Sequence, residues 1–348
     1  MSTNLNKHMK LGYAISKMRE FFLSCNYIEV NMNNNSKIMP NWYNDMDVDK
    51  DKDKDKDKDT NVMLYNKNYL SLLQSNKLCL DQYLLNNSEV KGCFSINMDY
   101  PKYTINQNKE NSLKLDFAGK GNIYDLIDTK KNLLDYFRFP RLNPGYFNKK
   151  NYSESFSRDY SGKHPDVREF SSIRWNKAAS IPGMDSIVIN KDKHKHKNNF
   201  YEGNYVALTK MFGVEKLENE HLNALSKKFG TVFFVKNTPL QHNLEWNIKY
   251  NRDSKISKNG FVILDGIKCI VSGENSCSSI EMRELFHNLD NGKFKDLLYD
   301  KYTKQVIDAE LNDYLKQNFF PRYTGSIEVE SLVNVLDNNN LIPSYVTA

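Results

Sequence analysis

The sequence lacks any long apolar run, and no stretch approaches the ~20 consecutive apolar residues of a membrane-spanning helix. Cysteine is scarce: the five cysteines show no C-x-x-C spacing, which argues against zinc fingers and a dense disulfide framework. The chain also lacks a P-loop, a G-x-S-x-G nucleophile elbow and an H-E-x-x-H zinc motif. These absences argue against an integral membrane protein and against the enzymes that such motifs mark. They make a reducing compartment the default expectation.

Apolar and aromatic residues are plentiful enough for a folded core. Of the 348 residues, 39% are hydrophobic and 12% are aromatic, which excludes global disorder. At roughly 150 residues per domain, this length predicts one large domain or two smaller ones.

The charge balance is mildly basic and unevenly distributed. The chain carries 49 Lys and Arg against 43 Asp and Glu, a formal charge of +6. Within it, Asp47–Asp59 is an almost pure Asp-Lys alternation with seven Asp and five Lys, so the remainder carries +8. This excess is spread along the chain, whereas nucleic-acid binders usually gather theirs on one face. We therefore interpret it as the basic surface of an enzyme.

Two stretches interrupt the regular patterns. On a helix the Asp-Lys run would place like charges at i,i+4, so it predicts a solvated insert at residues 45–60. Residues 140–205 are polar and aromatic without clear periodicity, and they predict an irregular insertion. The sequence thus predicts a single core within residues 1–348, interrupted by two inserts.

Helical and strand patterns alternate along the rest of the chain, but not in a regular βαβ rhythm. Apolar residues recur at helical spacing over Leu11–Leu23, and Tyr27–Val30 has strand character. A Gly-containing turn is expected at Tyr323–Ser326. The pattern predicts an α+β fold with an antiparallel sheet flanked by helices. Further helices are expected over 77–85, 123–137, 217–229 and 279–315, and further strands over 91–96, 113–117, 231–235, 260–264 and 268–271.

Short segments in a fixed order carry a resemblance to a known family. They are Phe22–Val30, Leu72–Leu78, Cys93–Ile96 with Leu115–Phe117, Gly230–Pro239, Asp265–Gly273 and Phe319–Ile327. In this order they resemble the catalytic core of class II aminoacyl-tRNA synthetases of the aspartate/asparagine branch, and of the related asparagine synthetase A. Phe22–Val30 is similar to motif 1 of that family, Cys93–Phe117 to motif 2 and Phe319–Ile327 to motif 3.

The resemblance implies a definite chemistry. ATP lies on the antiparallel sheet, and the carboxylate of an amino acid attacks its α-phosphate to form an aminoacyl-adenylate. Positioning and charge neutralisation supply most of the catalysis. In the family, one Arg holds the α-phosphate and the substrate carboxylate, a second Arg holds the outer phosphates, and acidic residues hold Mg²⁺. ATP and Mg²⁺ are accordingly the cofactors that the resemblance implies.

The positions that should carry these charges are substituted. The resemblance places the motif 3 Arg at Ser331, the metal-binding Glu at Lys268 and a following Arg at Asn275, while the acid after motif 2 is Ala118. Arg322 lies before the expected turn and is a poor substitute in this register. Each lost charge-assisted contact typically costs ~2–4 kcal/mol of transition-state stabilisation. Together these substitutions predict impaired or lost catalysis.

The remaining site candidates each have a structural alternative. Ser75 is also a plausible helix N-cap, and Gly273 and Glu274 are also explained by a simple turn. Lys268 could form a structural pair with Asp265. The predicted substrate-binding residues are Gln74, Ser75, Lys77, Gly273 and Glu274, and the predicted ATP-binding residues are Lys102, Gly325 and Ile327.

The sequence leaves three functions open. The first is an ATP-dependent ligase that makes an aspartyl or asparaginyl adenylate, for tRNA charging or for asparagine synthesis. The second is a catalytically inactive paralog that acts as a binding or regulatory partner. The third is a basic RNA-binding protein, which only the charge excess supports.

The expected partners and location depend on the resemblance. Motif 1 implies a homodimer through the Leu11–Leu23 helix, and tRNA is a candidate partner. Because motif 1 starts almost at residue 11, no anticodon-binding domain is expected before it. The cytoplasm is the expected compartment, with organellar import left open.

Overall fold

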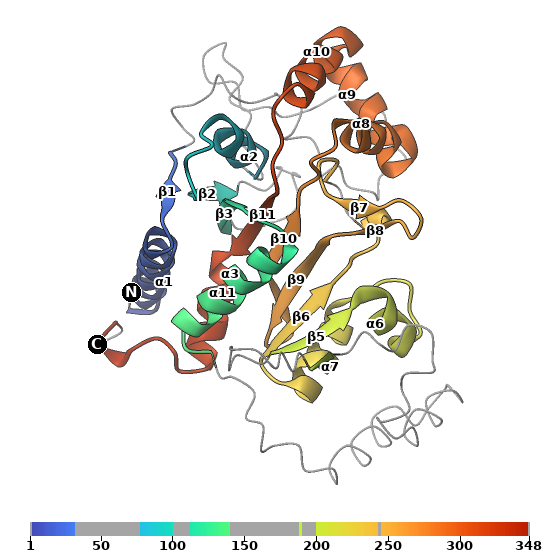
Figure 1. Cartoon of the computed structure of the whole chain (residues 1–348). Coiled ribbons are helices and arrows are strands. Elements are labelled where there is room, and N and C mark those ends of the chain that lie inside the picture. Colours follow the sequence, from blue (N-terminus) through green and yellow to red (C-terminus); the bar gives the residue numbers. More distant parts are fainter. Residues whose placement is uncertain are drawn as a thin grey trace, which may run out of the picture.

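A nine-stranded sheet forms the centre of the computed structural model, which describes residues 2–31, 77–99, 112–139, 188–189, 200–242 and 245–346 (Figure 1). Neighbouring strands are antiparallel, except that β1 runs parallel to β2 and β5 runs parallel to β6. This confirms the predicted α+β class. In sheet order the strands are β1 Tyr27–Glu29, β2 Gly92–Asp99, β3 Ser112–Lys120, β11 Arg322–Glu328, β10 Ile267–Glu274, β9 Asn259–Leu264, β6 Val232–Lys236, β5 Tyr201–Asn204 and β4 Val188–Ile189.

Helices cover both faces of this sheet and extend beyond it. In the described part of the chain, no helix is long and apolar enough to cross a membrane. A separate two-stranded sheet joins β7 Tyr250–Asn251 to β8 Ile256–Ser257. The helices are α1 Ser2–Ser24, α2 Lys77–Asn86, α3 Ile123–Tyr136, α6 Tyr205–Phe212, α7 Asn219–Phe229, α8 Ser279–Asn288, α9 Lys293–Tyr302, α10 Lys304–Leu315 and α11 Val329–Asn338, with short 3₁₀ turns at Leu240–His242, Leu289–Gly292 and Ser344–Val346.

The two faces of the sheet differ because successive side chains along a strand point to opposite sides. One face of the sheet, which we call the back face, includes Phe94, Phe117 and Ile327 and packs against α1, α3 and α11. The front face packs against α2 at Cys93 and Ala118. Further along the front face, at β6 and β9, the covering helices are α6 and α7. A fourth cluster of buried residues joins α8 and α10 to the loop before β7.

The predicted turn at Tyr323–Ser326 is wrong, because these residues lie inside β11 between β10 and β3. Gly325 suggested a turn, but its role is close packing. A Cβ on Gly325 would lie 2.4 Å from the Phe117 ring and 2.9 Å from the Ser272 Cβ, so only glycine fits there without displacement. Strand β11 leads directly into helix α11, which is the order that the resemblance to motif 3 implies.

Other boundaries also differ from the sequence-based expectation. The range 140–205 contains β5, and Asn204 caps α6 by accepting a hydrogen bond from the Val206 N–H at 3.0 Å. A four-residue strand is too short to show a period. The expected helical region 279–315 divides into three helices, with breaks where Asp290, Asn291 and Thr303 adopt positive φ. Insert 45–60 lies outside the described residues.

Two glycines on the back face make room for a pair of buried tyrosines. The hydroxyls of Tyr27 and Tyr323 lie 2.6 Å apart, and Thr129 on α3 lies 3.0 Å from the Tyr323 hydroxyl. Gly92 and Gly119 face each other across β2 and β3. A Cβ on Gly119 would lie 2.3 Å from the Tyr27 hydroxyl and 2.6 Å from the Tyr323 ring. The two tyrosines and Thr129 therefore join α3, β1 and β11, and the two glycines leave the space that the tyrosine rings need.

We expect Gly119→Ala to lower the free energy of unfolding by ~1–3 kcal/mol, since the added methyl group overpacks the tyrosine pair. Gly12→Ala is the matched control: nothing lies within 4 Å of the position where its Cβ would stand. Because Gly12 is an exposed position of α1, this change should raise the free energy of unfolding, by up to about 1 kcal/mol. Urea unfolding of both variants checks this; equal effects would contradict the assigned packing.

Candidate functional site

Polar side chains line the front face across β2, β3 and β11, next to β10. The ladder pairs Ala118 with Thr324 and Asp116 with Ser326, and it places Gly273 opposite Thr324. Asp116 is 1% exposed and accepts a hydrogen bond from the Ser326 hydroxyl. This is the face of the sheet on which the resemblance would place the substrates.

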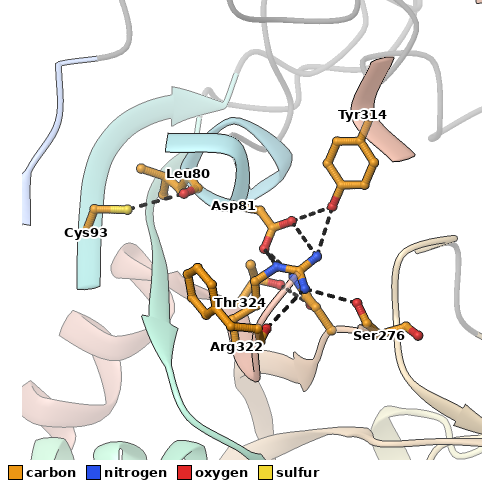
Figure 2. Close-up of polar contacts among 9 residues, drawn as sticks. Leu80, Asp81, Cys93, Ser276, Tyr314, Arg322 and Thr324 are labelled. Carbon is orange, nitrogen blue, oxygen red and sulfur yellow. Dashed lines mark hydrogen bonds and ion pairs between the residues drawn. The ribbon is translucent and has the colours of Figure 1, made fainter. Parts of the chain in front are cut away.

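An ion pair between Asp81 of α2 and Arg322 of β11 lies at one end of this face (Figure 2). Both side chains are 0% exposed. The Arg322 Nε donates to Asp81 Oδ1 at 2.7 Å, and its Nη2 donates to Oδ2 at 3.1 Å. Such a two-point contact fixes the orientation of both groups.

The remaining donors of Arg322 are occupied by the protein as well. Nη1 donates to the carbonyl oxygens of Ser276 at 3.0 Å and Phe320 at 3.4 Å, and Nη2 also donates to the Tyr314 hydroxyl at 3.1 Å. The guanidinium carbon lies 4.8 Å from the centre of the Phe319 ring. Burial alone would lower the pKa of Arg322, but the adjacent Asp81 carboxylate more than offsets this and raises the pKa above its ordinary value.

The oxygens of the Asp81 carboxylate also accept hydrogen bonds only from protein groups among the described residues. Besides Arg322, the carboxylate accepts from the Tyr314 hydroxyl at 2.5 Å and from the Asn275 side-chain amide at 2.7 Å. Asn275 is held in turn by the Thr324 hydroxyl, which donates to its Oδ1 at 3.1 Å. Burial, followed by the charge of Asp81, raises the pKa of Tyr314 and keeps it a neutral donor. The guanidinium is thus engaged by internal acceptors rather than presented to a ligand.

The substrate-binding candidates are separated by the sheet. Gly273 faces the front, where a Cβ would lie 2.2 Å from Ile248 Cδ1, so the apolar Ile248 side chain covers this position. Glu274 points to the back face, where its carboxylate accepts from Lys249 Nζ at 2.6 Å and from the Ile123 N–H at 3.2 Å. Lys77 forms an ion pair with Glu245. Gln74 and Ser75 lie outside the described residues.

The four positions at which the resemblance implies substituted catalytic residues also lie apart. Ala118 packs under α2, Asn275 belongs to the Asp81 network, and Ser331 lies in the first turn of α11. Lys268 is near the opposite end of β10, with its ammonium 5.0 Å from the centre of the Phe261 ring. The carboxylate of Asp265, the suggested structural partner of Lys268, instead accepts a hydrogen bond from Asn339.

The described ATP-binding candidates point away from the front face. Ile327 is 0% exposed in the back-face core. A Cβ on Gly325 would point to the same side of the sheet, toward Phe117. Only their backbone could contact a ligand on the front face. Lys102 lies outside the described residues.

The described acids do not fit a Mg²⁺ site. Within the described ranges, no group of three His, Cys, Asp or Glu side chains could hold a metal ion. Asp116 accepts from Ser326, and Glu328 lies 3.3 Å from the Lys114 ammonium. Glu274 is on the opposite face. The metal that the resemblance implies therefore has no evident ligand set in this part of the chain.

Sequence reasoning missed Asp81 and Tyr314. A signal was present for Asp81, which stands among Leu78, Leu80 and Leu84 on an otherwise apolar helix. A carboxylate in such a segment is buried at high cost unless a cation meets it. Nothing in the sequence identifies the partner, since Arg322 is 241 positions away.

Known structures share this arrangement of sheet and helices. Aspartyl-tRNA synthetase from Entamoeba histolytica superposes with a TM-score of 0.56 and 10% identity, over 96% of this chain and 56% of that chain. A putative aspartyl-tRNA synthetase from Leishmania major gives 0.59 and 12%, over 96% and 62%. Asparaginyl-tRNA synthetase from Pyrococcus horikoshii, complexed with asparaginyl-adenylate, gives 0.57 and 13%, over 99% and 67%.

The chain has the class II synthetase core fold. This confirms the resemblance at the level of the fold. The chain spans just over half to two thirds of the length of these synthetases. Comparison of the sequence with protein-family models gives no match, and comparison with curated proteins gives none either.

We expect Arg322→Met to lower the free energy of unfolding of this synthetase fold by ~3–5 kcal/mol, because it leaves the Asp81 carboxylate buried and unpaired. Arg252→Met is the control, since Arg252 and Glu284 form an exposed ion pair at 2.7 Å. Its loss should cost about 0–1 kcal/mol. Chemical denaturation followed by circular dichroism measures both, and a small effect at Arg322 would contradict the network described above.

Proposed function

We propose that this protein acts by binding, through a class II synthetase fold that has lost the ability to form an aminoacyl-adenylate. The observation that supports this is the state of Arg322. Its guanidinium donates to Asp81, Tyr314 and two backbone carbonyls, and it is 0% exposed. An arginine in this state does not neutralise a phosphate or a substrate carboxylate.

Physical reasons for lost catalysis extend beyond Arg322. Transfer to the α-phosphate of ATP requires fixed cations where negative charge develops. Ala118 and Asn275 are neutral and engaged with neighbouring protein groups, and Ser331 is half-buried on α11. A metal ligand at position 268 would carry a negative charge, whereas Lys268 carries a positive one. Since each absent contact costs ~2–4 kcal/mol, the combined loss removes most of the rate.

The test is amino-acid-dependent exchange of pyrophosphate into ATP by the purified full chain, with each of the twenty amino acids in turn. We expect no exchange above the level without amino acid. A known aspartyl-tRNA synthetase in the same assay is the positive control. Saturable exchange with one amino acid, aspartate or asparagine above all, would overturn the proposal and restore the ligase interpretation with ATP and Mg²⁺ as cofactors.

The partner that we propose is a second copy of this chain, bound through α1 and β1. Large apolar side chains are exposed on these elements: Leu5 by 64%, Met9 by 38%, Leu23 by 51% and Ile28 by 43%. β1 is also an edge strand of the sheet, with one side unpaired in the described chain. Self-association would bury both the apolar side chains and the open edge.

For the homodimer, we expect sedimentation at micromolar concentration to give twice the chain mass for the unmodified protein. The double substitution Leu5→Glu with Met9→Glu should give a monomer, because it places carboxylates in the apolar contact. Tyr124→Glu, which changes a side chain that is 74% exposed at the start of α3, is the control and should leave the dimer intact. A monomeric unmodified protein would exclude this partner.

We do not extend the proposal to RNA or tRNA. One basic surface element is the β7–β8 hairpin with its flanking residues, which carries Lys249, Arg252, Lys255 and Lys258. Two of these cations already pair with acids, Lys249 with Glu274 and Arg252 with Glu284. The charge left over is small for a phosphate-binding stripe.

A further inference from the structure

A cluster of three lysines and one glutamate lies between α3 and the β5–β6 end of the sheet. Lys130 and Lys131 come from α3, Glu202 from β5 and Lys236 from β6. Lys130 is 5% exposed and Glu202 is 3% exposed. We call these four residues the α3 lysine cluster. It belongs to the back face, since Glu202 pairs across the ladder with Phe234 of the back-face core.

Glu202 is shared by the two flanking lysines and not by Lys130. Its Oε1 lies 3.1 Å from the Lys131 ammonium, and its Oε2 accepts from Lys236. The Lys130 nitrogen instead lies 5.6 Å from the centre of the Phe234 ring. Among the described residues, no carboxylate lies within ion-pair distance of Lys130. A buried lysine without an acid partner is rare, because its charged form is costly to desolvate.

The surroundings favour the neutral amine. Burial is the largest effect on the pKa of Lys130, the charge of Lys236 lowers it further, and Lys131 adds a smaller decrease. Glu202 acts in the opposite direction. The resulting pKa of about 7 leaves a large share of Lys130 unprotonated at neutral pH, where an ordinary lysine is almost fully protonated. An unprotonated amine is a nucleophile.

The charge count of the α3 lysine cluster is unbalanced when Lys130 is neutral. Lys131 and Lys236 supply two positive charges, and Glu202 supplies one negative charge. One positive charge is left over in a site that is mostly buried. A negative group attached to Lys130 would balance it, without a metal and without moving the ion pairs already formed.

We propose that Lys130 is a site of reversible carbamylation by carbon dioxide. The lone pair of Lys130 Nζ attacks the carbon of CO₂ and forms an N–C bond, while one C=O electron pair moves onto oxygen. The nitrogen then loses one proton to solvent or bicarbonate, and a carbamate anion results. No oxidant, reductant or further co-reactant is needed. The positive charges of Lys131 and Lys236 act on Lys130 and would stabilise the carbamate. CO₂ is small and apolar enough to reach a buried amine.

The direct test is carbon-13 NMR of the full chain equilibrated with labelled bicarbonate, at a pH about one unit above the pKa of the amine. We expect a carbamate resonance in the unmodified protein. The resonance should persist in Lys131→Arg, which keeps the charge, and be absent in Lys130→Arg. It should also fade as the pH falls below about 7, because protonation removes the nucleophile. The absence of a carbamate resonance, or one that survives Lys130→Arg, would overturn the proposal.

A second measurement does not depend on the folding of any variant. Alkylation of the unmodified protein under CO₂ converts a carbamate into a stable ester, which peptide fragmentation can locate. We expect the ester on Lys130, whereas esters only on other amines would refute the site. Raising CO₂ at constant pH should also raise the thermal midpoint by about 1–2 °C. Since the cluster is on the back face, neither result depends on whether the front face activates amino acids.

Discussion

The Asp81–Arg322 ion pair joins parts of the molecule that are far apart in sequence. Asp81 comes from α2, Arg322 from the central strand β11, and both bond to Tyr314 of α10. Asn275, which follows β10, completes the contacts of the carboxylate. Because the two charges are fully buried, removal of either partner leaves the other uncompensated. The position of α2 over the front face and that of α10 beside it both depend on this pair.

The same pair is the main support for the proposed loss of adenylation on the front face. A class II synthetase fold can support adenylation only if fixed cations face the phosphates and the substrate carboxylate. Here the buried arginine already has a carboxylate partner, and Ile248 covers the sheet at Gly273. Apolar side chains exposed on α1 and β1 offer a contact surface on another part of the molecule. In the function that we propose, the fold is kept, while internal contacts take the place of the chemistry that it would carry.

The fold could be predicted from sequence more fully than the site. The helix over residues 123–137 shows a helical period because it buries one stripe. The strands over 231–235 and 260–264 are recognisable as short continuous apolar runs, because both of their faces are buried. The turn predicted at Tyr323–Ser326 is wrong because a glycine in the sequence usually indicates a turn. The sequence does not show that Gly325 is needed for close contact with the Phe117 ring on the neighbouring strand. The role of Arg322 could not be predicted, since local sequence does not show which distant carboxylate a buried arginine meets. The position of Glu274 could not be predicted either, because the pairing of β10 with β11 decides that its side chain points to the back face.

Thermal unfolding of the purified full chain with ATP, Mg²⁺ and either aspartate or asparagine tests the central claim most directly. A ligand that binds only the folded state stabilises it by RT ln(1 + L/Kd), where L is the ligand concentration, so the midpoint rises with ligand concentration. If Asp81 satisfies Arg322 as described, the midpoint should not change with any combination of these ligands. A rise that grows with ligand concentration and requires both ATP and one of the two amino acids would show that the front face still forms a synthetase active site.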